Sequence, residues 1–370
     1  MATAAPTAAG PAVERLEACA YTVPADEPES DGTLEWSSTT MVVVEVHAGG
    51  TTGLGYTYGD RSVAEFIRSQ LAEVVLGADV MAPPGAWSAM QRAIRNAGQS
   101  GAGAMALSAV DIALWDLKAR VLELPLIDVL PRFRDSVEVY GSGGFTSYPP
   151  ERLQAQLAGW SERGIRRVKM KVGRHPDEDP ARVRAAREAI GEATELMVDA
   201  NGAYERKQAL AWAGRFASAG VTWLEEPVSS EDLAGLRLIR DRAPAGLEIA
   251  AGEYAWRLSD LRRLLDAGAV DVLQGDVTRC GGITGMLGAD ALCRRHGVPF
   301  SAHCAPAVSA HACCAMETLR HLEYFHDHVR AEALLFDGTL QPDGGLLRPD
   351  RSRAGLGIEL RRADAARFAE

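Results

Sequence analysis

The chain has little lysine, no long apolar run and no basic segment. Only four of its 39 lysine and arginine residues are lysine, and the formal net charge is -11 with a pI near 5.3. A nucleic-acid-binding surface needs basic side chains that displace counterions from phosphates, so we expect no nucleic-acid partner. No stretch approaches the roughly 20 apolar residues of a membrane span, and residues 1–14 lack the basic and apolar regions of a signal peptide. These absences predict a cytoplasmic protein without a membrane partner.

The cysteines lack the paired spacing of a disulfide framework or a zinc cluster. Most of them lie in apolar segments with helical periodicity, where a free thiol packs as a small hydrophobic group. We therefore expect buried, free thiols. The six cysteines are Cys19, Cys280, Cys293, Cys304, Cys313 and Cys314.

From residue 137 onward, short β-rich runs alternate with stretches of helical periodicity. The predicted strands span residues 137–142, 167–172, 195–200, 221–225, 248–253, 270–275, 298–303 and 320–324. The helices predicted between them span 150–163, 180–190, 207–219, 231–242, 259–267, 282–296 and 306–319. Parallel strands joined by right-handed helical crossovers favour a closed α/β barrel, and an open doubly wound sheet is the alternative.

The start and the tail of the chain differ from this region. We predict strands at 36–47 and 53–58 and helices at 62–75, 86–96 and 104–121. The tail is rich in glycine and proline and resumes short strand-like runs. At 370 residues the chain is long enough for a barrel and an accessory domain. We therefore predict an α+β capping domain over 1–125, completed by 336–370, and a barrel domain over 126–335.

Acidic residues stand at the ends of three consecutive predicted strands: Asp199, Glu225 and Glu253. In an α/β barrel these strand ends line the mouth, where carboxylates so close together would repel one another unless a cation lay between them. An all-oxygen site suits Mg²⁺. Each acid alone could equally be a solvated strand end or an ion-pair partner. Glu226 is set aside because neighbouring residues of an extended chain point to opposite sides.

Lys169 and Lys171 are two residues apart on one predicted strand, so both project into the barrel. Repulsion between the two ammonium groups and partial burial would lower a lysine pKa, which suits a general base. Lysines at a solvated strand end are the alternative interpretation. The scarcity of lysine elsewhere favours the catalytic one.

Asp276 follows the sixth predicted strand, His303 ends the seventh and Glu323 lies within the eighth, and together they complete the ring of polar side chains. A carboxylate bonded to one imidazole nitrogen fixes the tautomer and raises the basicity of the other nitrogen. A lone histidine, in contrast, is more often structural. The remaining histidines have no comparable placement and receive no role; they are His47, His175, His296, His311, His321, His326 and His328.

In their order along the chain, these residues resemble the enolase superfamily and, within it, the mandelate racemase subgroup. The resemblance implies a modified TIM barrel, (β/α)₇β, beneath a capping domain. It also implies that Asp199, Glu225 and Glu253 bind Mg²⁺ and that Lys169 helps to hold a substrate carboxylate. Lys171 and His303, the latter paired with Asp276, would be bases on opposite faces of the substrate. Glu323 would be the acid that hydrogen-bonds the enolate oxygen.

The resemblance implies abstraction of the proton next to a carboxylate, giving an enolate that the metal stabilises. Within that chemistry we favour dehydration of an acid sugar, an aldonate or aldarate, to a 2-keto-3-deoxy acid. The reason is that segment 25–36, which should close the mouth, is polar. Glycines of segment 49–55 suggest a second mobile loop that could contact the substrate.

Two alternatives stay open on the same residues. The first is a racemase or epimerase of a 2-hydroxy acid, and the second is a catalytically silent barrel kept for binding or structure. Whether the protein is a dehydratase or a racemase, its partner is a small-molecule carboxylate. We also expect a homo-oligomer.

Overall fold

The computed structural model describes residues 10–370. Residues 1–9, which include the start of the predicted capping domain and part of the segment compared with a signal peptide, lie outside the described residues. Among residues 10–370, no helix combines the length and the apolarity that crossing a bilayer requires.

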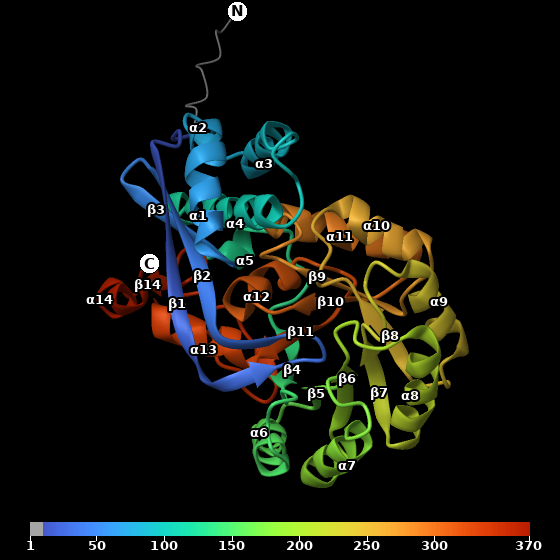
Figure 1. The fold of residues 1–370 in the computed structure, drawn as a ribbon. Coiled ribbons are helices and arrows are strands. Elements are labelled where there is room, and N and C mark those ends of the chain that lie inside the picture. Colours follow the sequence, from blue (N-terminus) through green and yellow to red (C-terminus); the bar gives the residue numbers. More distant parts are fainter. Residues whose placement is uncertain (1–9) are drawn as a thin grey trace, which may run out of the picture.

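An antiparallel sheet and a group of helices form the cap, which covers one side of the barrel (Figure 1). The sheet has the order β1 (Arg15–Ser30), β2 (Glu35–Ala48) and β3 (Thr51–Tyr58). The second half of β2 is buried on both faces because its alternate residues enter two separate apolar clusters, one with Val42 and Val44 and the other with Met41 and Val43. The helices are α1 (Arg61–Phe66), the π-helix η1 (Ile67–Leu71), α2 (Ala72–Val75), α3 (Pro83–Ala93), α4 (Ala102–Val121) and α5 (Leu126–Val129).

Strand β1 was not predicted, and the first half of segment 25–36, which was expected to be a polar lid, belongs to it. Segment 25–30 is the end of β1, and the chain turns through 31–34 into β2. Charged residues and two prolines hide the strand in the sequence, since proline cannot donate to a ladder and is tolerated only at edges and bulges. The pairing shifts register between Pro24 and Glu29, which accommodates these residues at the sheet edge.

The predicted mobile glycine loop is largely wrong. Gly49 and Gly50 form the turn between β2 and β3, but Gly53 and Gly55 lie inside β3 against α4. A Cβ atom at Gly55 would be 2.2 Å from the Ala109 carbonyl oxygen. These two glycines therefore allow close contact between strand and helix and do not form a flexible loop.

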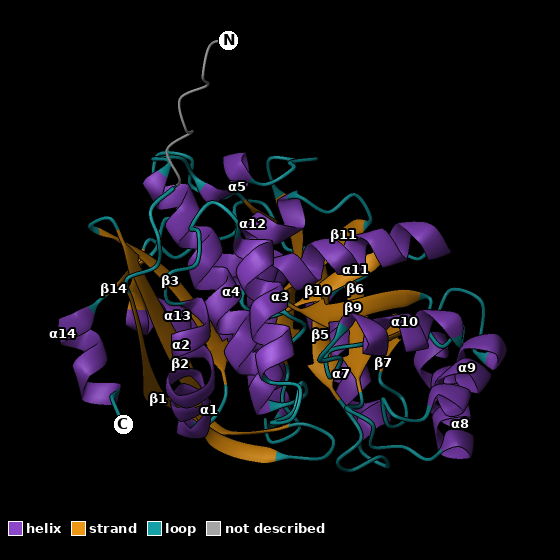
Figure 2. Ribbon diagram, turned by 90° about the horizontal axis from the view of Figure 1, so that it is seen from above, coloured by secondary structure: helices purple, strands orange, loops and turns teal. Residues whose placement is uncertain are grey.

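The predicted α/β barrel is confirmed. Its eight parallel strands follow one another around the ring, and pairing of the last with the first closes it. They are β4 (Val137–Gly143), β5 (Arg167–Lys171), β6 (Glu195–Asp199), β7 (Val221–Glu225), β8 (Glu248–Ala251), β9 (Val272–Asp276), β10 (Phe300–His303) and β11 (Leu319–Phe325). Figure 2 shows these strands beside the separate sheet of the cap.

Each barrel strand is followed by a helix. These helices are α6 (Pro150–Glu162), α7 (Asp179–Ile190), α8 (Arg206–Ser218), α9 (Leu233–Arg242), α10 (Leu258–Asp266), α11 (Gly282–His296), α12 (Pro306–Cys314) and α13 (His326–Leu335). Helix α12 is shorter than predicted, and α13 after the eighth strand was not predicted.

The tail runs from the barrel back to the cap. Its elements are β12 (Phe336–Asp337), β13 (Leu346–Leu347), β14 (Glu359–Leu360), α14 (Arg362–Ala365) and the 3₁₀ helix η2 (Ala366–Phe368). Strand β13 pairs with β4, whereas Ala369 pairs with Tyr21 of β1. Figure 1 accordingly shows red α14 beside the blue strands. The domain boundaries at 125 and 335 stay predictions.

Candidate active site

The strand register brings the predicted site residues to one end of the barrel. Lys171 is paired with Asp199, which is paired in turn with Glu225. Farther around the ring, Asp276 is paired with His303. Because all strands are parallel, their carboxyl ends meet at one rim, which is where barrel enzymes place their active sites.

The three predicted metal ligands converge. Asp199, Glu225 and Glu253 each offer a carboxylate oxygen within 4.8 Å of the others, and all three are buried. Burial and Asp199 raise the pKa of Glu225 to about 8. Such an all-oxygen donor set, with excess negative charge, fits a hard divalent cation such as Mg²⁺.

Both lysines face carboxylates. Lys169 Nζ lies 2.5 Å from Glu225, 2.9 Å from Glu323 and 3.6 Å from Asp199, and Lys171 Nζ lies 2.5 Å from Asp199. Burial opposes charge on both amines, but Glu225 beside Lys169 and Asp199 beside Lys171 raise the pKa of each lysine above its ordinary value. Among these side chains alone, the pKa of each lysine is raised and not lowered as predicted, because each ammonium lies beside a carboxylate.

His303 stands at the other end of the acidic group. Its Nδ1 is 2.8 Å from Asp276, and its Nε2 is 3.0 Å from Glu253 and 3.4 Å from Glu323. Burial opposes charge on the imidazole, but the surrounding groups, including Cys304 and Glu253, raise its pKa well above the ordinary value. The contact with Asp276 orients the ring so that Nε2 is directed to the acids.

Glu323 is a carboxylate in this arrangement. Burial opposes its charge, but Lys169 holds the pKa of its carboxyl below the ordinary range. The hydrogen-bond donor role that the resemblance implies for Glu323 stays a prediction.

Glu226 is buried next to the same acids. Its φ of +37° shows that the chain has left the extended conformation, so the rule that placed Glu226 on the opposite side does not apply. Burial and Glu253 raise the pKa of Glu226 well above its ordinary value. The reason for setting Glu226 aside is therefore wrong, although the oxygens that meet within 4.8 Å include Glu225 and not Glu226.

A cavity of about 530 Å³ lies between this group and the cap. Of the predicted site residues, Lys171, Glu253 and His303 line it. Lys169 is fully enclosed and lies outside the lining. The cap contributes the polar residues Asp31, Trp36, Ser38, Thr39, Thr40 and Asp60.

Several cavity residues were missed. Asn201 and Cys304 follow strand ends, and both have positive φ, at +44° and +52°. His328, which had received no role, lines the cavity from α13 and stacks on Tyr58 with ring centroids 3.4 Å apart. The proximity of Asn201 and Cys304 to predicted ligands was a usable signal, whereas His328 depended on a helix that was not predicted.

A pair of acids joins the cap to the barrel beside the cavity. The indole nitrogen of Trp36 donates to Glu29, at 3.0 Å, and to Asp327, at 2.8 Å. Glu29 is fully buried, and Tyr148 donates to it from the barrel. Burial, followed by the contact with Asp327, raises the pKa of Glu29 to about 9. Burial and the neighbouring carboxylate thus favour the protonated form of Glu29 in the folded protein.

We expect Glu29→Gln to flatten the pH dependence of stability. Between the ordinary pKa near 4.5 and the folded value, the native state holds a proton that the unfolded state releases. Stability consequently falls as pH rises, by up to ~1.4 kcal/mol per pH unit for one such proton. Urea unfolding at pH 5.5, 7 and 8.5 measures the free energy of unfolding. As pH rises, this free energy should fall less in Glu29→Gln than in wild type. Exposed Glu27→Gln is the control, and equal behaviour of both variants would contradict the assignment.

Similarity to known proteins extends over most of the chain. The family described as mandelate racemase/muconate lactonizing enzyme, N-terminal domain, matches residues 22–130, and the enolase C-terminal domain-like family matches 152–365. The sequence is 32% identical to 3,6-anhydro-alpha-L-galactonate cycloisomerase of Streptomyces coelicolor, over 95% of this chain and 98% of that protein.

Two solved structures extend this similarity. A mandelate racemase/muconate lactonizing enzyme-like protein from Rubrobacter xylanophilus is 69% identical, with a TM-score of 0.96 over 97% of this chain and 100% of that one. L-talarate/galactarate dehydratase from Salmonella typhimurium, liganded with Mg and L-lyxarohydroxamate, is 30% identical, with a TM-score of 0.90 over 100% and 96% of the two chains.

Proposed function

Because this chain belongs to the mandelate racemase/muconate lactonizing enzyme family of enolase-like proteins, we propose that it dehydrates an acid sugar to a 2-keto-3-deoxy acid. The chain is an enzyme of the enolase superfamily, and its relatives include acid sugar dehydratases and cycloisomerases. The proposal concerns its own reaction, substrate class and residue roles.

One observation carries the proposal. The three buried carboxylates are flanked at one end by an amine, Lys171 beside Asp199, and at the other end by an imidazole, His303 beside Glu253. The acids come from the ends of β6, β7 and β8. In the ring these strands lie between β5, which carries Lys171, and β10, which carries His303. A substrate carboxylate held at the acids would therefore have a proton-transfer group on each flank.

The three carboxylates would hold Mg²⁺. When bound, the ion supplies positive charge that stabilises the electron-rich transition state. Lys169, enclosed among Glu225 and Glu323, would position these acids, and its contact with the substrate carboxylate stays a prediction.

The reaction follows from the two flanking groups. Lys171 would accept the proton in its neutral form as the α-carbon–hydrogen bond breaks. A cation held by the three carboxylates would offset the Asp199 charge that raises the pKa of this amine. His303 donates a proton to the β-hydroxyl as the carbon–oxygen bond breaks and water leaves, and the resulting enol becomes the 2-keto-3-deoxy acid. Asp276 keeps His303 Nε2 directed toward the substrate.

The cavity favours an acid sugar with one carboxylate. The basic lining residues among those the structure describes, Lys171, Arg279, His303 and His328, all come from the barrel. Toward the cap the lining offers hydroxyls together with Asp31 and Asp60. Sugar hydroxyls can hydrogen-bond to these groups, whereas a second carboxylate would meet like charge. We therefore place aldonates ahead of aldarates.

A racemase or epimerase is the second candidate, because groups on both flanks also allow a proton to return to the opposite face. The test is incubation with Mg²⁺ and matched aldonate and aldarate pairs, followed by NMR of the products. We expect a 2-keto-3-deoxy acid from an aldonate and a kcat/KM at least about 10-fold lower for its aldarate partner. Inversion without a keto product would contradict dehydration, and faster turnover of the aldarate would contradict the substrate class.

A further inference from the structure

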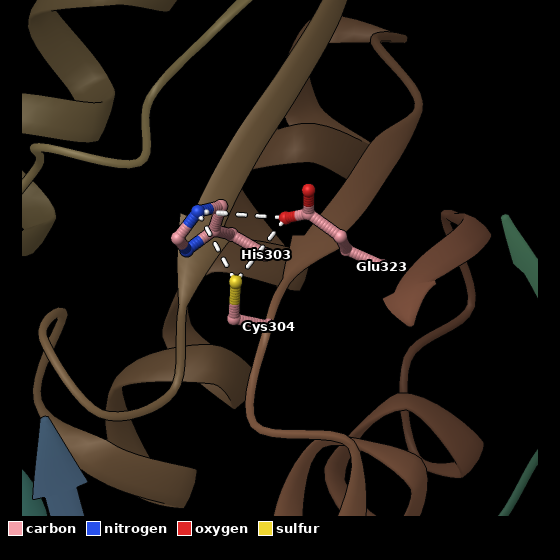
Figure 3. A group of neighbouring side chains, drawn as sticks. All are labelled: His303, Cys304 and Glu323. Carbon is pink, nitrogen blue, oxygen red and sulfur yellow. Dashed lines mark hydrogen bonds and ion pairs between the residues drawn. The ribbon is translucent and has the colours of Figure 1, made fainter. Parts of the chain in front are cut away.

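The thiol of Cys304 lies between two of the site residues. Cys304 Sγ is 3.3 Å from His303 Nε2 and 3.3 Å from Glu323 Oε2, and these two atoms are 3.4 Å apart (Figure 3). All three residues are buried, and the three atoms form a nearly equilateral triangle of one nitrogen, one sulfur and one oxygen.

This triangle has the dimensions of one face of a zinc coordination tetrahedron. Zinc bonds to sulfur, nitrogen and oxygen measure roughly 2.0–2.3 Å, and neighbouring donors of a tetrahedron are about 1.6 bond lengths apart, or ~3.3–3.7 Å. The observed separations fall at the short end of this range. His303 and Cys304 also line the cavity, so the fourth position of such a tetrahedron can open toward it.

The surrounding contacts hold the three donors in place. Asp276 occupies His303 Nδ1, as outer-shell carboxylates do for metal-binding histidines, and a metal ion at Nε2 would replace the 3.0 Å contact of Nε2 with Glu253. Lys169 binds Oε1 of Glu323 and leaves Oε2 directed at the thiol. Successive residues of a strand point to opposite faces, but Cys304 follows the end of β10 with a φ of +52°, so its thiol can meet the preceding imidazole.

The chemistry of this set differs from that of the three carboxylates. Sulfur and imidazole donors favour Zn²⁺ and similar ions, whereas oxygen donors favour Mg²⁺. The two sets share no residue. We propose that His303, Cys304 and Glu323 form an inhibitory site for a thiophilic divalent cation such as Zn²⁺. Its inhibitory effect rests on the proposed function, in which His303 transfers a proton, but binding of the ion does not.

Binding is a ligand exchange. The S–H bond of Cys304 is replaced by a sulfur–zinc bond, and its proton passes to the buffer. The imidazole gives up its Nε2 proton to the buffer, binds through Nε2 and keeps its proton on Nδ1, facing Asp276. His303 can then neither donate nor accept a proton at Nε2, so the reaction stops while the ion is bound.

Co²⁺ spectroscopy with saturating Mg²⁺ tests binding without any substrate. We expect a sulfur-to-cobalt charge-transfer band in wild type and in Cys19→Ser, whose thiol is exposed, and its loss in Cys304→Ser and Cys304→Ala. Displacement of Co²⁺ by Zn²⁺ should show an affinity for Zn²⁺ more than about 100-fold weaker in both Cys304 variants, beyond the loss caused by an outer-shell change. Circular dichroism checks that the variants are folded. A band that survives in both Cys304 variants, or no band in wild type, would overturn the site.

Inhibition is then measured with the aldonate identified by the product screen. Zn²⁺ should inhibit wild type and Cys19→Ser at saturating Mg²⁺, and each Cys304 variant should tolerate at least about 100-fold more Zn²⁺ relative to its own uninhibited rate. Equal sensitivity of all variants would place the inhibition at the three carboxylates and overturn the proposal. Failure of the dehydratase assignment would leave the cobalt band unchanged, so the two outcomes are distinguishable.

Discussion

Lys171→Met should lower kcat/KM by about 10³- to 10⁴-fold, the upper part of the range for loss of a general base. Methionine fills a similar volume without an amine, so the barrel should stay folded. The loss should extend to exchange of the substrate α-proton with solvent deuterium, because Lys171 carries out the first step. NMR in D₂O measures the exchange and the keto product in the same sample.

Two further variants separate this step from general damage. Lys207→Met removes an exposed lysine on α8 and should retain wild-type activity. His303→Asn should abolish the keto product yet retain α-proton exchange, since Lys171 is intact. If Lys171→Met keeps the wild-type rates of exchange and product formation, Lys171 is not the base. Full activity in both Lys171→Met and His303→Asn would show that neither residue takes part in catalysis.

The barrel could be predicted because its strands and helices are encoded locally. The strand at residues 221–225 and the helix at 282–296 were predicted with the bounds that the structure shows. Parallel strands buried on both sides read as short apolar runs, and chain connectivity then fixes their order around the ring. The acidic strand ends followed from the same pattern, which is why Asp199 and Glu225 were found.

The elements that were missed depend on tertiary contacts. Strand β1 carries charged residues and prolines that argue against a strand, and its pairing with β2 overrides that local preference. Helix α13 contains two histidines and two acids in its first seven residues and shows no clear apolar stripe, yet it is held between barrel and cap. Gly53 and Gly55 indicated flexibility, but their meaning depends on the backbone of α4 lying against them.

The sequence also could not predict the charges and contacts that surround Lys169 and Cys304. Neighbouring lysines on one strand predicted mutual repulsion, whereas the fold places acids from three other strands around Lys169. The Cys304 thiol likewise meets Glu323 only through the pairing of β10 with β11. Distances across a barrel decide both features, and no local pattern encodes them.

Neutralising one of the three carboxylates should abolish tight Mg²⁺ binding. Glu253→Gln and Asp199→Asn preserve shape but remove a charged ligand, and each loss should exceed the roughly 10- to 100-fold effect of changing an outer-shell partner. Asp290→Asn is the matched control, because Asp290 is a buried carboxylate of α11 bonded to Thr318, outside the candidate active site. We expect this control to bind Mg²⁺ as wild type does.

Calorimetric titration of Mg²⁺ into wild type and these variants tests the central claim most directly and needs no substrate. The account predicts one ion per chain in wild type and in Asp290→Asn, and no tight binding in Glu253→Gln or Asp199→Asn. Unchanged affinity and stoichiometry in both of these variants would show that the ion binds elsewhere and would contradict the account.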